Sequence, residues 1–154
     1  MGTWSRDEIE QAFTEYQEAA AEGGATGNWE RWANTFTVDA TYKEHLYGYF
    51  EGRQAILDWI SSTMSAWPNS AFTSFPIDWY TVDEDRGWVI CKVWNRLEDP
   101  GDGSVHQEYN ITILHYAGDG LWSYEEDIYN PAPFADVVGA WIAVRRSLGV
   151  TDGN

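Results

Sequence analysis

Four strand-like segments separated by short turns make up most of the second half of the chain, and they constrain its fold more than any other feature. Each segment is rich in β-branched and aromatic residues, and the turns between them are rich in Asp and Gly. The segments are residues 72–82, 87–98, 105–116 and 121–129. Connections this short join neighbouring strands that run in opposite directions. The sequence therefore predicts an antiparallel meander of four strands.

Helical spacing of apolar residues marks the segments on either side of this meander. The predicted helices begin near Ser5, Asn28, Arg53 and Pro131. Ser5 and Glu8 form a capping box at the first helix, and Gly23-Gly24 is expected to end it. Residues 40–50 contain rings and branched side chains and are interpreted as one further extended segment.

The order of these elements predicts an α+β fold. The chain of 154 residues has the usual size of one domain, and we place a single domain at residues 1–154, with an ordered core from about residue 4 to residue 149. A curved antiparallel sheet with helices packed on its concave face forms a cone-shaped barrel. The interior of such a cone is either hydrophobic core or ligand pocket, depending on the polarity of the side chains that point inward.

Charge and composition exclude several classes of function. Asp and Glu number 25 against 9 Lys and Arg, a formal net charge of -16, so nucleic acids and anionic membrane surfaces should repel the chain. No apolar run approaches the ~20 residues that span a bilayer, and the N-terminus lacks the order of a signal peptide. The one cysteine cannot form an internal disulfide. We expect a cytoplasmic protein that binds neither nucleic acid nor membrane.

Alternation along the strands assigns their side chains to two faces. Asn95, Asn110, Thr112 and Asp127 fall on the faces expected to point into the cone. The large rings predicted on the opposite face are Trp88, Trp94 and Trp122. Because both faces carry large rings, we expect one to line a pocket seeded with polar groups and the other, the outer sheet face, to meet a second copy in a homodimer.

Three stretches of the sequence resemble the nuclear-transport-factor-2-like superfamily. They are Phe36-Thr37-Val38-Asp39-Ala40-Thr41-Tyr42, Gly52-Arg53-Gln54-Ala55-Ile56 and Tyr116-Ala117-Gly118-Asp119-Gly120-Leu121-Trp122-Ser123. The branch that looks most similar is that of the SnoaL-like polyketide cyclases, whose relatives include ketosteroid isomerase, scytalone dehydratase and limonene-type epoxide hydrolase. The resemblance covers nearly the whole chain and implies a cystatin-like α+β roll. Its motifs identify the fold better than the reaction, because this fold hosts many reactions and non-enzymes.

The resemblance to ketosteroid isomerase implies roles for residues at three positions. Tyr16 falls near the tyrosine of the first helix, and Glu44 falls at the general base. Thr112 stands on or near the position of the second carboxylic acid of the oxyanion hole. The oxyanion hole of that enzyme is therefore incomplete in this chain unless Asn95 or Asn110 substitutes.

The other relatives imply other residues. Asp127 matches one acid of the epoxide hydrolase set, whereas Arg96 matches the arginine of that set only loosely. The paired histidines and tyrosines of scytalone dehydratase imply His45 with Tyr42 or Tyr129. In SnoaL-like cyclases an acid–base residue acts on an activated methylene, and the candidates for this role are Asp127 and His45.

Each candidate also has a purely structural interpretation. Glu44 could be a solvated carboxylate on an edge strand, whereas Asp127 lies between apolar neighbours, where an unpaired carboxylate is costly. Asn95 and Asn110 could hydrogen-bond to each other. Trp59, on the inward stripe of the third helix, is expected to line the cone. The three histidines and the cysteine are scattered, so we expect neither a metal nor a cofactor.

These residues together favour a cofactor-independent enzyme or enzyme-like protein that transfers a proton on a small, apolar, oxygen-bearing molecule. A carboxylate, Asp127 or Glu44, would move the proton while tyrosine hydroxyls and amides stabilise the developing oxyanion. Neighbouring strand residues point to opposite faces, so only one of Glu44 and His45 should face the cone. One alternative is a non-catalytic dimeric module that binds a small hydrophobic ligand. Another is epoxide hydrolysis, which requires Arg96 to face the cone.

Overall fold

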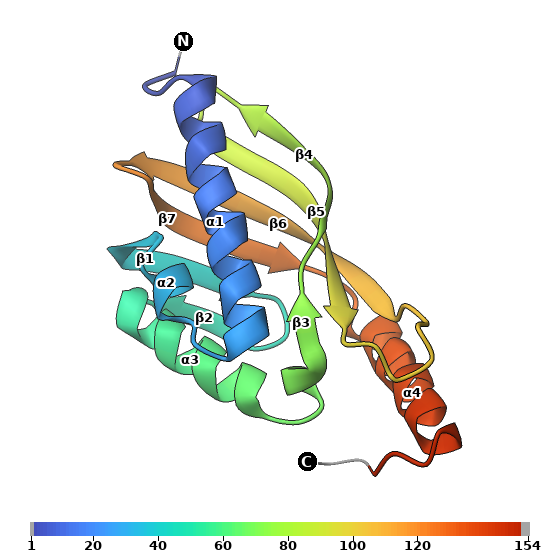
Figure 1. Ribbon diagram of the computed structural model, residues 1–154. Helices are drawn as coiled ribbons and strands as arrows, with labels where there is room; N and C mark the ends of the chain where they lie inside the picture. The colour runs from blue at the N-terminus through green and yellow to red at the C-terminus, as the bar shows by residue number, and fades with distance from the viewer. Residues whose placement is uncertain (1, 152–154) are drawn as a thin grey trace.

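The computed structural model describes residues 2–151, which form one curved sheet with helices along its concave side (Figure 1). Residues 1 and 152–154, the outer ends of the predicted domain, lie outside the described residues. The helices are α1 (Arg6–Thr26), α2 (Glu30–Ala33), α3 (Arg53–Ser65) and α4 (Pro131–Ser147), with a 3-10 turn η1 (Asn69–Ala71). The strands are β1 (Phe36–Glu44), β2 (Gly48–Glu51), β3 (Phe72–Ser74), β4 (Ile77–Asp83), β5 (Trp88–Leu97), β6 (Gln107–Gly118) and β7 (Leu121–Ile128). The predicted α+β class is confirmed.

The strands follow the order β2-β1-β7-β6-β5-β3, and β4 also pairs with β5. Strands β4, β5, β6 and β7 pair antiparallel in chain order, as the meander prediction requires. Strand β1 instead runs parallel to β7, which the sequence did not indicate. In that register Tyr42 lies opposite Glu125 and Glu44 lies opposite Asp127. The parallel pair therefore brings polar residues from the two ends of the sequence onto one part of the sheet.

Two segments predicted as single strands are each broken. The stretch 40–50 turns back after β1, and β2 begins at Gly48, whose φ of 108° is a conformation that other residues rarely adopt. The stretch 72–82 is interrupted at Phe75-Pro76 between β3 and β4. Proline has no backbone N–H to donate to a continuous ladder.

Helix α1 does not end at Gly23-Gly24 but continues to its cap at Gly27, which has a left-handed φ of 77°. A Cβ atom on Gly23 would lie 2.4 Å from the ring of Trp29, and one on Gly24 would lie 2.4 Å from the carbonyl oxygen of Thr73. The two glycines therefore permit close packing of α1 against its neighbours rather than ending the helix.

One residue of β7 lies on the opposite face from the one predicted. Trp122 was expected outside, yet its side chain is 0% exposed and its ring contacts that of Tyr116. Trp122 pairs with Tyr116 whereas Tyr124 pairs with His115, so Ser123 is the extra residue of a β-bulge. The bulge shifts the alternation of inward and outward side chains within this strand.

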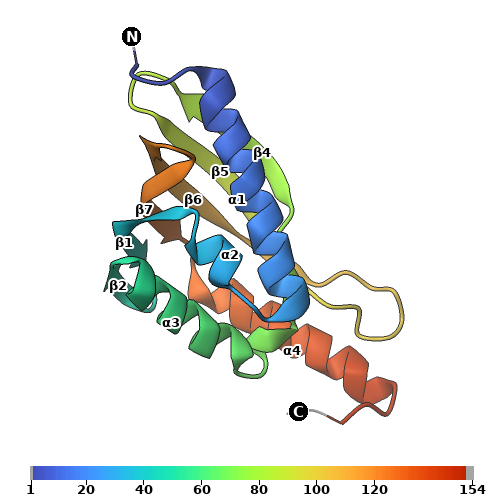
Figure 2. The same ribbon diagram turned by 60° about the vertical axis from the view of Figure 1, so that its left-hand side comes forward.

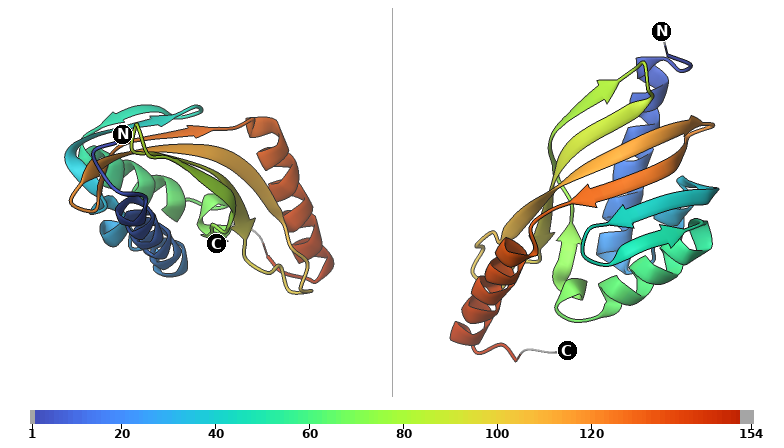
Figure 3. Two further views of the ribbon diagram at one scale, coloured as in Figure 1. Left: turned by 90° about the horizontal axis from the view of Figure 1, so that it is seen from above. Right: turned by 180° about the vertical axis from the view of Figure 1, so that it is seen from behind.

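The helices cover the sheet in two separate places. Figure 2 shows α1, α2 and α3 along the concave face, where they enclose the main core with the sheet. Helix α4 lies past one end of the sheet (Figure 3) and packs a second, smaller core. At its centre the fully buried Trp141 contacts the cluster of Phe72 and Leu97 and donates its indole N–H to the carbonyl oxygen of Glu98 at 2.8 Å.

Two features are absent from residues 2–151. No helix among them is long and apolar enough to cross a membrane. No group of three or more His, Cys, Asp or Glu side chains in that range could hold a metal ion.

Candidate functional site

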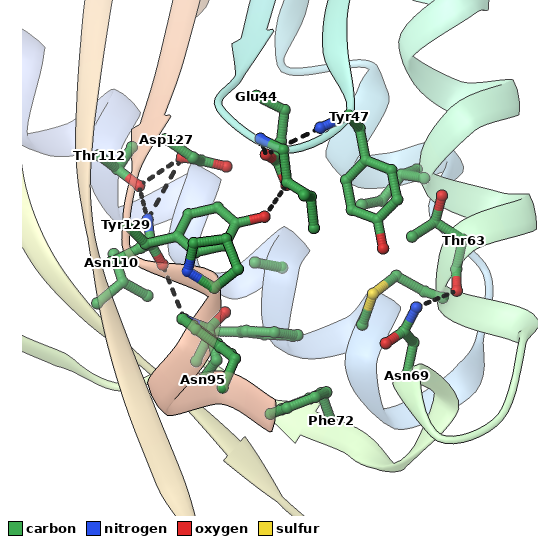
Figure 4. A pocket seen from close by; sticks show the side chains of 18 of the residues that line it. Glu44, Tyr47, Thr63, Asn69, Phe72, Asn95, Asn110, Thr112, Asp127 and Tyr129 are labelled. Carbon is green, nitrogen blue, oxygen red and sulfur yellow. Dashed lines mark hydrogen bonds between the residues drawn. The ribbon is translucent and has the colours of Figure 1, made fainter. Parts of the chain in front are cut away.

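A cavity of about 570 Å³ lies between the sheet and the helices (Figure 4). Residues of both the main core and the α4 cluster line it. Leu46 and Tyr47 of the β1–β2 turn line one side and are 56% and 47% exposed, and the exposed Ala135 and Gly139 of α4 line another. The mouth of the cavity is therefore between this turn and α4. The volume is in the range of small-molecule sites.

All but two of the candidate residues line this cavity. They are Tyr16, Tyr42, Glu44, Trp59, Asn95, Asn110, Thr112, Asp127 and Tyr129. His45 does not join them: its Nε2 lies 2.6 Å from Oε2 of Glu126. Glu126 follows Glu125 on β7, so its side chain points away from the cavity. As expected from strand geometry, only Glu44 of the Glu44-His45 pair faces inward.

Two carboxyl groups of β7, those of Glu125 and Asp127, form the polar wall of the cavity. They are two residues apart on one strand, so they share a face. Glu125 is only 2% exposed, whereas Asp127 keeps partial exposure. Sequence reasoning missed Glu125, although the alternation already placed it beside Asp127. The spacing of two acids on an inward face was the available signal.

Two tyrosine hydroxyls bind this carboxyl pair. The hydroxyl of Tyr16 donates to Oε1 of Glu125 at 2.6 Å. The hydroxyl oxygen of Tyr42 lies 2.5 Å from Oε2 of Glu125 and also contacts Oδ2 of Asp127. A phenol has one proton to donate, so Tyr42 donates to one carboxyl and the other must itself carry a proton. The two carboxyls therefore share a proton through the Tyr42 hydroxyl.

Hydrogen bonds and burial assign that proton to Glu125. Burial raises the pKa of Glu125 well above its usual range, and the charge of Asp127 raises it further. Burial raises the pKa of Asp127 as well, but hydrogen bonds from Tyr42 and Thr112 oppose that rise. Oδ1 of Asp127 accepts from the Thr112 hydroxyl at 2.7 Å. Asp127 is therefore the ionised member of the pair.

A row of polar side chains on β5 and β6 orients toward Asp127. Nδ2 of Asn95 donates to Oδ1 of Asn110 at 2.8 Å, and Nδ2 of Asn110 donates to Oγ1 of Thr112 at 2.7 Å. Nδ2 of Asn110 also reaches Oδ1 of Asp127 at 3.4 Å. Asn95 and Asn110 do bond to each other, and the chain of hydrogen bonds from Asn95 through Asn110 and Thr112 ends at the Asp127 carboxylate.

Glu44 forms a second acidic centre nearer the mouth. Its Oε2 accepts from the Tyr129 hydroxyl at 2.6 Å, and its Oε1 accepts from the backbone N–H of Leu46 at 2.6 Å and of Tyr47 at 3.4 Å. Burial, the hydrogen bond to Glu44 and the Glu44 charge raise the pKa of Tyr129, which keeps its hydroxyl a donor. Glu44 is 7% exposed, so it is not the solvated edge carboxylate of the structural interpretation.

Trp59 and Arg96 differ in where they lie relative to the cavity. Trp59 lies at the cavity wall, where its ring stacks on Phe50 at 4.6 Å and contacts the ring of Tyr42 at 4.9 Å. Arg96 does not line the cavity; its Nε donates to Oε1 of Gln107 at 3.0 Å. The arginine that the epoxide hydrolysis alternative requires is therefore not in the cone.

A curved sheet wrapped by helices around a polar-seeded cavity is the architecture of the nuclear-transport-factor-2-like proteins, and the predicted fold is confirmed. Within that class, the chain belongs to the SnoaL-like domain family, whose model matches residues 13–124. No curated protein matches the sequence at a significant level.

Three solved structures illustrate the shared fold. A protein of ketosteroid isomerase-like fold from Catenulispora acidiphila DSM 44928, in complex with trimethylamine, is 20% identical with a TM-score of 0.65, and the match covers 81% of this chain and 92% of that chain. A LEH-like epoxide hydrolase from M. tuberculosis is 10% identical with a TM-score of 0.68, over 96% of both chains. An NTF2-like protein from Anabaena variabilis ATCC 29413 is 16% identical with a TM-score of 0.63, over 84% of this chain and 95% of that chain. Identities this low establish the shared fold alone.

Proposed function

We propose that this chain is a cofactor-independent acid–base enzyme that moves a proton on a small, largely apolar, oxygen-bearing substrate. The observation that carries the proposal is the Tyr42 hydroxyl between the carboxyls of Glu125 and Asp127. When two carboxyls share one proton, one of them stays ionised and can act as a base while the other stays neutral. Apolar and aromatic walls around them suit a substrate that is mostly hydrocarbon.

Asp127 acts as the base in this scheme. It is the ionised and more exposed carboxyl, so it removes a proton from a carbon next to a substrate carbonyl. The electron pair of the broken C–H bond forms a C=C bond to the carbonyl carbon, and the π electron pair of the carbonyl moves to its oxygen, which becomes an oxyanion. Asp127 then holds the proton as a neutral acid and returns it to another position of the substrate. Glu125 keeps its proton throughout and holds Tyr42 in place.

The hydrogen-bond donors around Asp127 stabilise the negative charge as it moves from Asp127 to the substrate oxygen. While Asp127 is ionised, the hydroxyls of Tyr42 and Thr112 and the amide of Asn110 donate to it. Once Asp127 is neutral, these donors bind it less strongly and can donate hydrogen bonds to the substrate oxyanion beside it. Donors that are already oriented need no reorganisation during the reaction, which lowers the barrier.

Hydrogen–deuterium exchange tests this scheme without knowledge of the natural substrate. The probe is 2-indanone, a small apolar ketone with acidic C–H groups, and NMR follows the loss of their signals in D2O. We expect the protein to accelerate exchange and Asp127→Asn to lower the catalysed rate by about 10²-fold or more. Glu126→Gln is the matched control, since the neighbouring carboxyl points to the opposite face. Equal rates in Asp127→Asn and the unchanged protein would show that Asp127 is not the base.

The rival function is a non-catalytic module that holds a small hydrophobic ligand. The apolar walls of the cavity favour it as much as they favour an enzyme. Binding of 2-indanone, measured by quenching of tryptophan fluorescence, with exchange no faster than in buffer would favour this alternative.

A homodimer through the outer sheet face and a cytoplasmic location also remain proposals. Partly exposed rings on β4 and β6 support the dimer: Trp79 and Tyr109 are 46% and 42% exposed. A single large ring at a surface is common, whereas a group of them on one sheet favours an interface. A molar mass of 17.6 kDa by light scattering, that of one chain, would argue against the dimer.

A further inference from the structure

The charges that line the cavity are of one sign. Glu44 and Asp127 face it beside the protonated Glu125, and no Lys, Arg or His lines it within residues 2–151. Lys43 and His45, the sequence neighbours of Glu44, instead face Glu126 on the opposite side of the sheet, at 3.7 Å and 2.6 Å. Carboxylates held away from water are stabilised by a cation as well as by hydrogen bonds. Since the lining supplies no cation, a ligand can supply it.

Tyrosine side chains lie on both sides of the carboxylate nearest the mouth. Figure 4 shows Glu44 between Tyr129 on one side and Tyr47 on the other. The ring of Trp59 lies 4.9 Å from that of Tyr42 and 6.0 Å from that of Tyr47, between centroids. Phe50 stacks on Trp59 at 4.6 Å and, because it does not line the cavity, supports Trp59 from behind. The faces of Trp and Tyr rings attract cations, most strongly where water is excluded.

We infer that the ligand of this cavity carries a cationic amino or quaternary ammonium group, which binds at the mouth beside Glu44 among the rings of Tyr42, Tyr47 and Trp59. This inference rests on the proposed function only in placing the ligand in the same cavity. The cationic group lies at Glu44, while the apolar and oxygen-bearing part extends inward toward Asp127. Both oxygens of Glu44 already accept hydrogen bonds, so the carboxylate is oriented before a ligand arrives.

Two probes of the same shape isolate the contribution of charge. Choline has a quaternary nitrogen where 3,3-dimethylbutan-1-ol has an uncharged carbon. Titrations followed by tryptophan fluorescence or calorimetry give a Kd for each. We expect choline to bind at least about tenfold more tightly than the alcohol, the ratio expected for cation–π contacts together with one carboxylate. Equal Kd values, or no detectable binding of choline, would overturn the inference.

Variants test which residues cause the preference for choline over the alcohol. Glu44→Gln should bring the two Kd values to within about threefold, whereas the control Glu126→Gln should keep the full preference. Glu44 also accepts hydrogen bonds from the β1–β2 turn, so its substitution could disturb the fold there. Tyr47 is 47% exposed and provides a second pair of variants. Tyr47→Leu should reduce the preference and Tyr47→Phe should keep it, because only a ring attracts the cation. An unchanged preference in both Glu44→Gln and Tyr47→Leu would contradict the assigned site.

Asp127→Asn separates this inference from the proposed function. It should abolish catalysed exchange of 2-indanone and leave the preference for choline in place. A protein that catalyses exchange but does not prefer choline fails the inference alone. One that prefers choline through Glu44 but catalyses no exchange fails the proposed function alone.

Discussion

The hydroxyl oxygen of Tyr42 lies 2.5 Å from Oε2 of Glu125, and backbone pairing accounts for this contact. The two residues are opposite each other in the parallel pair of β1 and β7. Their side chains therefore emerge from neighbouring strands onto the same face, and the contact needs no adjustable loop. Because the pairing of β1 with β7 fixes this contact, a change to the shared proton should alter the free energy of unfolding as well as the activity.

Tyr42→Phe should lower the free energy of unfolding by about 1–3 kcal/mol, because it removes the hydroxyl that donates to Asp127 and accepts from Glu125, two buried carboxyls. Urea denaturation at pH 7 measures the change. Tyr80→Phe is the control: its hydroxyl donates to Glu10 at 3.1 Å at an exposed position, and its loss should change the free energy by less than about 0.5 kcal/mol. Similar losses in both variants would contradict the shared-proton arrangement.

Glu125→Gln should flatten the dependence of stability on pH. Burial raises the pKa of Glu125 in the folded protein, so above its ordinary value of 4.5 the folded state keeps a proton that the unfolded chain releases. Stability contributed by this group is complete below that pH and is lost as pH rises toward the folded pKa. The loss reaches at most about 1.4 kcal/mol per pH unit.

Urea denaturation between pH 5 and pH 8 tests the slope. Glu15→Gln is the control, because the hydrogen bond from Arg31 lowers the pKa of Glu15 and its contribution changes only at more acidic pH. If Glu125→Gln and the unchanged protein lose stability in parallel over this range, Glu125 is not the protonated acid.

Gly23→Ala should destabilise the protein by about 1–3 kcal/mol, since the new methyl group would lie 2.4 Å from the ring of Trp29. Gly139→Ala is the opposite case: nothing lies within 4 Å of its added methyl group. At that position in α4, alanine should raise stability by about 0.5–1 kcal/mol through its better helix propensity. Thermal unfolding monitored by circular dichroism distinguishes the two variants. A loss of stability in both would mean that the contact with Trp29 does not cause the destabilisation of Gly23→Ala.

Cys91 should be unreactive in the native protein. Its side chain is 0% exposed, and burial raises the pKa of the thiol, so neither access nor thiolate is available. A thiol reagent such as DTNB should release its chromophore only after guanidinium is added, with one equivalent per chain. Rapid reaction under native conditions would contradict the assigned burial.

Local rules predicted much of this fold. The capping box at Ser5 forms, with its Oγ accepting from the backbone N–H of Glu8 at 3.1 Å. Strict alternation placed Asn95 and Asn110 at the cavity, as the structure has them. These features depend only on residues near one another in sequence, which is why they could be predicted from the sequence alone.

Features that depend on distant residues could not be predicted in this way. The parallel pairing of β1 with β7 joins segments about eighty residues apart, and no local pattern signals it. The bulge at Ser123 reversed the predicted face of Trp122, because alternation assumes an uninterrupted ladder. Glu125 was missed because its role depends on tyrosines contributed by α1 and β1.

Helix α4 both stabilises the fold and shapes the cavity. Trp141 anchors the helix in a cluster of its own, while Phe134, Val138 and Ile142 form part of the cavity wall. Substitutions at these three positions can enlarge or narrow the space offered to a ligand without altering the main core or the Glu125–Asp127 pair. The helix is thus the natural starting point for a mutant library that seeks new ligand specificity with the carboxyl pair unchanged.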